Sequence, residues 1–119
     1  MKEDPMRITF TARHYKAPER LKEYAEKKVR RLKRYYDGII ECEIELDYEK
    51  LVQVAEISIK VYGQKLLAVE KTEDIYKSID LAVDKLERQL KKYKEKLRGH
   101  NREKVALGDL SSLEPEQGG

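Results

Sequence analysis

The chain has 119 residues, a length that predicts one domain with a single modest core. Charged residues make up 41% of it and apolar residues 39%, which is polar for a globular protein but compatible with folding because the apolar residues are periodic. No apolar run approaches membrane-spanning length, and the first five residues lack the hydrophobic core of a signal peptide. We therefore expect a cytoplasmic protein that does not associate with a membrane.

The first two predicted elements are a strand over Arg7–Thr11 and a helix that begins at Pro18 and ends before Asp37-Gly38. Ile8 and Phe10 alternate with polar residues in the strand. Pro18 is expected at the first position of the helix, and Asp37-Gly38 supplies the glycine that often follows a helix end. The apolar stripe of this helix consists of Leu21, Ala25, Val29, Leu32 and Tyr36.

Basic residues follow the exposed side of this helix at spacings of three and four. We call Lys27, Arg30, Arg31 and Arg34 the first basic row. Like charges this close repel one another. The acidic residues that could offset that repulsion stop at Glu26, so ligand binding is favoured over a merely solvated helix end.

The second predicted strand, Ile39–Tyr48, alternates strictly between apolar and acidic residues. Its inward side is expected to carry Ile40, Cys42, Ile44, Leu46 and Tyr48, and its outward side Glu41, Glu43, Glu45 and Asp47. Alternate strand positions lie about 7 Å apart and no chelating loop is present, so the acidic row indicates a solvated sheet face rather than a metal site. Cys42, the single cysteine, is predicted to be a buried small hydrophobe.

Two further strands follow a reversal at Glu49-Lys50. Val52–Tyr62 forms the third strand, and the opposite phase of Val52 and Val54 predicts a bulge or a late strand start near Gln53–Ala55. Gly63-Gln64 marks a tight hairpin before a fourth strand over Lys65–Glu70. The continuous apolar run 66–69 leaves the facing of this strand open.

The second predicted helix covers Thr72–Arg98, with Thr72 as its N-cap and Gly99 after its end. At about 1.5 Å per residue it runs about 40 Å, whereas an eight-residue strand covers about 26 Å, so its C-terminal half should overhang the sheet. Its apolar stripe consists of Ile75, Ile79, Val83, Leu86, Leu90, Tyr93 and Leu97. Its later polar positions are mostly basic, and we call Lys85, Arg88, Lys91, Lys92 and Lys94 the second basic row.

The charge is distributed unevenly between the helices and the rest of the chain. Segments 19–36 and 85–98 hold 15 of the 26 Lys and Arg and 5 of the 23 Asp and Glu, a net charge of +10 that leaves −7 elsewhere. A basic surface opposed to an acidic one favours oriented approach to a polyanion.

The order of elements predicts an α+β fold, β-α-β-β-β-α. We expect a four-stranded mixed sheet with both helices packed on one face, similar to a double-stranded-RNA-binding domain with an added strand. Residues 6–98 form the predicted domain. Residues 99–119 lose periodicity and gain Gly, Ser and Pro, which is typical of a flexible tail or linker.

Motifs for catalysis are not found in the sequence. The two histidines, His14 and His100, have no partner at metal-ligand spacing, and neither a Gly-rich phosphate loop nor a nucleophile motif occurs. We expect no enzyme activity, no cofactor, no metal and no small-molecule substrate. Two basic helices without a row of sheet aromatics favour recognition of folded RNA by backbone and shape.

The string Asp74-Ile75-Tyr76-Lys77-Ser78-Ile79-Asp80, followed by Lys85-Leu86-Glu87-Arg88-Gln89-Leu90-Lys91-Lys92-Tyr93-Lys94, resembles the second-helix signature of the ribosome hibernation-promoting factors. That family includes ribosome-associated inhibitor A and was formerly called sigma-54 modulation protein, and the resemblance covers about Met6–Arg98. It implies binding to the 16S rRNA of the small ribosomal subunit, in the channel between head and body where mRNA and tRNA lie. It further implies translation inhibition during stress or stationary phase.

Carried over by position, the rRNA-binding residues would be both basic rows: Lys27, Arg30, Arg31, Arg34, Lys85, Arg88, Lys91, Lys92 and Lys94. Arg13 and His14, in the loop after the first strand, are further candidates. Two other function classes stay open, a protein-interaction adaptor that binds an acidic partner protein and an uncharacterised enzyme. The sequence also leaves open whether the chain is a short family member or part of a long one, and whether it promotes or opposes ribosome pairing.

Overall fold

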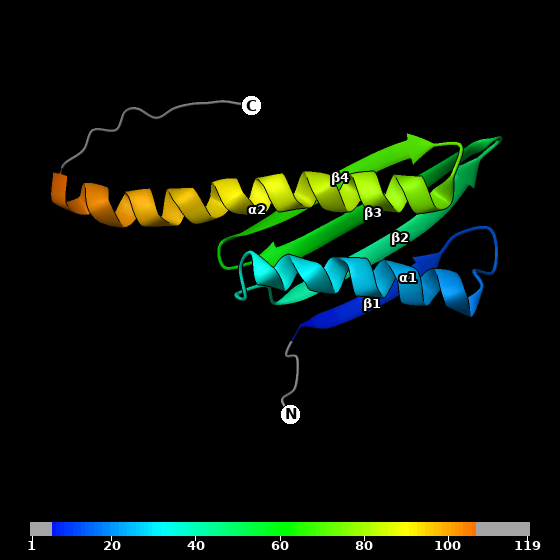
Figure 1. The fold of residues 1–119 in the computed structure, drawn as a ribbon, viewed down its shortest axis with the longest axis horizontal. Helices are drawn as coiled ribbons and strands as arrows, with labels where there is room; N and C mark the ends of the chain where they lie inside the picture. Colours follow the sequence, from blue (N-terminus) through cyan, green and yellow to red (C-terminus); the bar gives the residue numbers. More distant parts are fainter. Residues whose placement is uncertain (1–5, 107–119) are drawn as a thin grey trace.

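The computed structural model describes the backbone of residues 6–106 and the side chains of residues 6–98. A four-stranded sheet forms one layer, and two helices form the other (Figure 1). The elements are β1 (Arg7–Ala12), α1 (Glu19–Arg30), a 3-10 turn η1 (Arg31–Arg34), β2 (Glu41–Glu49), β3 (Val52–Val61), β4 (Gln64–Thr72) and α2 (Ile75–Ala106).

The sheet has the strand order β1-β2-β3-β4, with β1 and β2 parallel and the other neighbours antiparallel. Both helices lie side by side on the same face of this sheet (Figure 1). The predicted α+β fold, its β-α-β-β-β-α order and its mixed sheet are therefore confirmed. The comparison with double-stranded-RNA-binding domains stays a prediction.

The core lies between the inward side of the sheet and one stripe of each helix. Leu21, Ala25, Val29 and Leu32 of the first helical segment are buried, as the spacing predicts. Five stripe residues of α2 are also buried: Ile79, Val83, Leu86, Leu90 and Tyr93. Complete burial of a large aliphatic side chain contributes about 1.5–3 kcal/mol, so the many buried side chains of this two-layer interface stabilise the fold strongly.

Two predictions about β2 and β3 are wrong. Ile40 is 49% exposed, and its neighbour Ile39 is in the core instead, because the strict alternation holds only from Glu41, where pairing with β3 begins. No bulge interrupts β3 and its start is not late, since pairing runs without a break from Glu49 opposite Val52. Val54 is nevertheless buried, on the outer side of the sheet.

The structure settles the facing of β4. Leu66 and Ala68 point into the core, whereas Leu67 and Val69 are exposed on the outer side. The turn before this strand consists of residues 62 and 63, because Gln64 already pairs with Val61. Gly63 has a φ of +85°, a left-handed conformation that glycine adopts without strain.

The ends of the first helix differ from the expectation in two details. Pro18 is the N-cap rather than the first helical residue, with extended backbone angles. The helix ends in a 3-10 turn, in which the N–H of Tyr35 donates to the carbonyl of Leu32. Gly38 is required for space rather than for a left-handed conformation, because an added Cβ would lie 2.6 Å from the ring of Tyr36.

Helix α2 begins and ends later than predicted. Its N-cap is Asp74, whose carboxylate accepts the N–H of Tyr76 at 3.0 Å, while Thr72 is the last residue of β4. The helix continues through Gly99 to Ala106 and extends beyond the sheet, as expected from its length (Figure 1). Leu97 is accordingly 40% exposed. The rest of the predicted tail, residues 107–119, lies outside the described residues.

Candidate nucleic-acid interface

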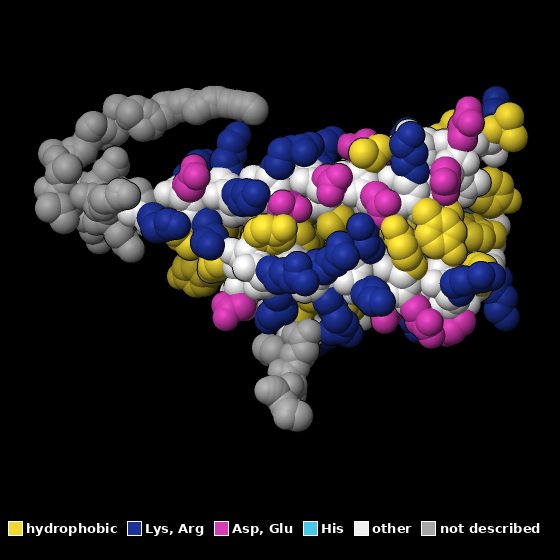
Figure 2. Space-filling view, in the orientation of Figure 1, with side chains coloured by type: hydrophobic (Ala, Val, Ile, Leu, Met, Phe, Trp, Pro, Cys, Tyr) yellow, Lys and Arg dark blue, Asp and Glu magenta, His cyan; other side chains and the backbone are white. Residues whose placement is uncertain are grey.

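The first basic row lies on the solvent side of the helical layer. Its four side chains are exposed, because the opposite side of the helix is committed to the core through Leu21, Ala25, Val29 and Leu32. Two of its members, Arg31 and Arg34, belong to η1 rather than to α1. Figure 2 shows the resulting concentration of Lys and Arg side chains over this helix.

The second basic row is divided between the two sides of α2. Lys91 and Lys94 face the first helix: the Lys91 ammonium lies 5.3 Å from the centre of the Tyr35 ring, and Lys94 lines a shallow depression together with Arg34. Lys85 is on the opposite side, where its ammonium pairs with Glu70 of β4 at 2.7 Å. Arg88 and Lys92 follow Lys85 at helical spacings of three and seven and share its side.

Carboxylates interrupt the positive charge along α2. Figure 2 shows Asp and Glu side chains between the basic ones on this helix. Glu87 pairs with Lys91 at 3.4 Å, an i,i+4 contact that helical spacing favours. Lys85 and Lys91 therefore already have carboxylate partners. The members of the second row that form no ion pair with a described residue are Arg88, Lys92 and Lys94.

A polar contact that the sequence did not reveal joins the two helices. The Tyr24 hydroxyl donates to the Asp80 carboxylate at 2.6 Å, and the Lys28 ammonium lies 3.2 Å from the same oxygen. The hydrogen bond to Asp80 raises the pKa of Tyr24 to about 12. The Tyr24 ring also meets Tyr76 edge to face, with centroids 4.9 Å apart. These contacts join α1 to α2, the two helices that carry most of the basic rows.

Arg13 and His14 lie apart from the helical cations. The Nδ1 of His14 is 2.8 Å from the Asp47 carboxylate, a contact that holds the pKa of Asp47 below its usual range. His14 has a φ of 70°, so this loop has a left-handed residue where it leaves β1. Arg13 lines a depression on the outer side of the sheet beside Glu45. The structure thus groups this loop with the acidic face rather than with the basic rows.

The outer face of the sheet carries the acidic row of β2, as predicted. Glu45 lies directly opposite Glu56 of β3, a like-charge pair across the two strands. Among the residues that the structure describes, no three His, Cys, Asp or Glu side chains are placed to hold a metal ion. Cys42 is buried as predicted, and this burial raises the pKa of its thiol to about 12. No helix within residues 6–106 is both long and apolar enough to cross a membrane.

Solved structures of other proteins have the same fold as this chain. A ribosomal subunit interface protein from Coxiella burnetii has a TM-score of 0.72 and 33% identity, over 76% of this chain and 99% of that chain. The N-terminal domain of Protein Y from Thermus thermophilus has a TM-score of 0.69 and 34% identity, over 74% and 99% of the two chains.

Sequence comparison leads to the same group of proteins. The ribosome hibernation promoting factor of Azotobacter vinelandii is 37% identical over 91 residues, which are 76% of this chain and 85% of that protein. Its Escherichia coli K12 counterpart is 33% identical over 95 residues, 80% of this chain and the whole of that protein. Residues 8–98 match the family model described as sigma 54 modulation protein / S30EA ribosomal protein. The chain therefore belongs to the sigma 54 modulation protein / S30EA ribosomal protein family.

Proposed function

We propose that this protein is a ribosome hibernation factor, which binds the 16S rRNA of the small ribosomal subunit through the solvent side of its two helices. The observation that carries the proposal is the exposed first basic row beside Lys94 of the second, in a family whose relatives are named for ribosome hibernation. In this role the protein would hold ribosomes inactive during stress or stationary phase.

The chemistry of the helical face favours the phosphate backbone as ligand. Guanidinium and ammonium groups at helical spacing match phosphates, whereas sequence reading of single strands uses rows of aromatic side chains on a sheet. Most tyrosines on the helical side are already engaged, as the Tyr24–Tyr76 and Tyr36–Tyr93 ring pairs illustrate. The rRNA contact would therefore depend on shape and charge rather than on base sequence.

The proposed site on the subunit is the channel that mRNA and tRNA occupy during translation. A chain whose Cα atoms extend over 52 × 38 × 17 Å would exclude both ligands from the channel by volume alone. Inhibition would then require no catalytic step and would be reversible. The nine residues of the two basic rows are the proposed contacts, with Lys85 and Lys91 contributing least because Glu70 and Glu87 already neutralise them.

Co-sedimentation with purified ribosomal subunits at several salt concentrations tests the proposal. We expect the protein to sediment with the small subunit at 50 mM salt and to be released as salt rises, because phosphate contacts release counterions. Replacing Arg31 and Arg34 by Glu should abolish the interaction. Replacing Lys50 and Lys71 by Glu is the matched control, since it changes the net charge equally but lies off the helical layer. An adaptor for an acidic protein would instead fail to sediment with either subunit.

A further inference from the structure

The tip of the β3–β4 hairpin presents a tyrosine that differs from the other seven. Three ring pairs engage Tyr15 with Tyr48, Tyr24 with Tyr76 and Tyr36 with Tyr93, and Tyr35 lies under the Lys91 ammonium. Tyr62 is 82% exposed, and its ring contacts no aromatic or cationic side chain among the described residues. Such a ring is free to stack on a ligand.

The hairpin holds the backbone at Tyr62 in a defined position. Gly63 forms the tight turn with a φ of +85°, and the buried Tyr93 of α2 donates its hydroxyl proton to the carbonyl oxygen of Tyr62 at 2.7 Å. The tip is therefore tied to α2 at the end of the sheet that this helix overhangs (Figure 1). A ligand at the tip would therefore lose little affinity to ordering of the backbone.

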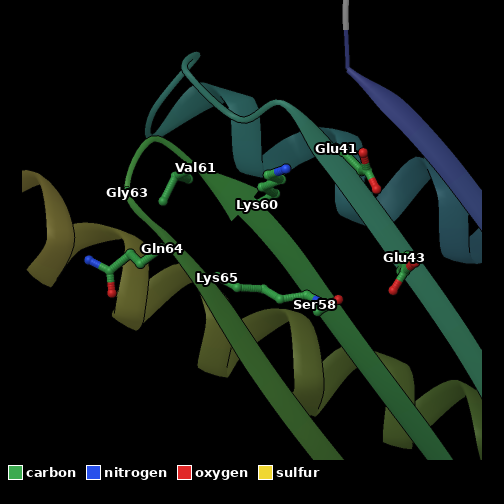
Figure 3. A pocket seen from close by; sticks show the side chains of 8 residues that line it. All are labelled: Glu41, Glu43, Ser58, Lys60, Val61, Gly63, Gln64 and Lys65. Carbon is green, nitrogen blue, oxygen red and sulfur yellow. The ribbon is translucent and has the colours of Figure 1, made fainter.

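Two lysines flank the tyrosine along the hairpin, and Glu41 of β2 lies directly opposite one of them, Lys60. Lys60 of β3 lies directly opposite Lys65 of β4, and like charges in this arrangement destabilise a sheet. Neither ammonium forms an ion pair with any residue that the structure describes. Both lysines line a depression of about 480 Å³ on the outer face of the sheet, shown in Figure 3. Glu41 offsets part of the charge of Lys60, and a bound anion would compensate the rest of the repulsion between the two lysines.

The rest of the lining limits what that anion can be. Glu41 and Glu43 of β2 form the far side of the depression, and the Ser58 hydroxyl lies between them and Lys65 (Figure 3). These carboxylates would repel a second phosphate but can accept hydrogen bonds from ribose hydroxyls, which distinguish RNA from DNA. Tyr62 does not line the depression itself but lies between two residues that do, Val61 and Gly63, so a single nucleotide would reach from the lysines to the ring at the hairpin tip.

We propose that the β3–β4 hairpin binds one unpaired nucleotide of RNA, with its base stacked on Tyr62 and its phosphate between Lys60 and Lys65. This inference rests on the proposed function, since it adds to the helical face a second RNA contact on the same molecule. The two contacts differ in chemistry: the helices neutralise the backbone of folded RNA, whereas the hairpin takes a base that has left its helix.

A tryptophan at position 62 tests the stacking directly, because the chain contains no other tryptophan. Oligouridylate of 12 nucleotides is the probe, and an RNA duplex of equal length is its paired control. The emission of the Tyr62→Trp variant should be quenched saturably by the single strand and much less by the duplex. Leu51→Trp, at the other hairpin tip and 84% exposed in the native chain, should not respond. Equal quenching of the two variants would contradict the proposal.

Affinity measurements with a labelled oligouridylate separate stacking from charge. Tyr62→Ala should weaken binding by roughly five- to 150-fold, the range for one stacked base, whereas Tyr62→Phe should keep the affinity within about twofold. Replacing both Lys60 and Lys65 by Gln should weaken binding and reduce its salt dependence. Unchanged affinity of Tyr62→Ala, with an unchanged melting temperature, would overturn the assignment.

Crosslinking within the small subunit decides between RNA and protein as the partner. Azidophenylalanine in place of Tyr62 should crosslink to 16S rRNA, and crosslinks to ribosomal proteins alone would refute the proposal. Co-sedimentation reports separately on the proposed function. If the protein sediments with the subunit but position 62 gives neither quenching nor an rRNA crosslink, the hairpin proposal fails alone. If position 62 responds to RNA but the protein does not sediment, the proposed function fails instead.

Discussion

Neutralising two arginines of the first basic row should weaken the salt dependence of ribosome binding by a calculable amount. Seven of the nine proposed contact residues remain once Lys85 and Lys91 are set aside with their carboxylate partners. Seven phosphate contacts give a slope of log affinity against log salt of about −5 to −6, or a loss of about three to four decades between 50 and 200 mM. Replacing Arg31 and Arg34 by Gln should reduce the steepness of that slope by about 1.4–1.8.

The assay is equilibrium binding of labelled protein to purified small subunits at four salt concentrations. Arg88 and Lys92, also replaced by Gln, should lower the slope equally, because they form no ion pair with a described residue. The free energy of unfolding of both double variants should lie within about 0.5 kcal/mol of the native value, since all four side chains are exposed. A slope that stays at its native value in the Arg31 and Arg34 variant would refute the assignment of these residues as phosphate contacts.

Three further predictions concern the fold. Leu86→Ala should lower the free energy of unfolding by about 2–5 kcal/mol in urea titrations, because Leu86 is fully buried, and a loss below 1 kcal/mol would contradict its place in the core. Cys42 should resist iodoacetamide at pH 8 and react once urea unfolds the chain. Burial raises the pKa of its thiol to about 12 in the folded protein, against about 8.5 in the unfolded chain. The free energy of unfolding should therefore decline as pH rises from about 8.5 toward 12, because only the unfolded chain loses the proton readily in that range. A chain that ends at Arg98 should keep a cooperative thermal transition, since the buried apolar residues precede it, and loss of that transition would assign later residues to the core.

Hydrophobic periodicity predicted the architecture of this protein, but not which residue of an adjacent apolar pair faces the core. Strict alternation identified Cys42, Ile44 and Leu46 as inward residues of β2. It could not decide between the adjacent Ile39 and Ile40, because strand pairing rather than residue type determines which one enters the core. The same limitation applies to the run 66–69, whose facing depends on the turn before β4.

The sequence did not predict either boundary of α2 correctly. Both Thr72 and Asp74 are good N-caps, and the choice depends on how far β4 continues pairing with β3. Gly99 predicted a helix end, yet α2 continues to Ala106, since a single glycine costs only about 1 kcal/mol in a helix.

The sequence predicted which residue types form the candidate site, but only part of how these residues are arranged in space. Exposure of the first basic row followed from helical spacing, whereas Lys85 and Lys94 of the second row are half-buried. The division of the second row did not follow from that spacing, because the side of α2 that faces α1 depends on tertiary packing. Contacts between distant positions were equally inaccessible: Tyr24 and Asp80 are 56 residues apart, and nothing in the sequence links them.

Competition with initiator tRNA and mRNA for the small subunit tests the central claim most directly. Binding of the labelled protein is measured on empty subunits and on subunits that already carry both ligands. If the protein occupies the channel, prior loading should reduce its binding strongly, and adding protein first should in turn reduce tRNA binding, because the ligands share one volume. Equal affinity for empty and loaded subunits would place the protein outside the channel and contradict inhibition by occupancy.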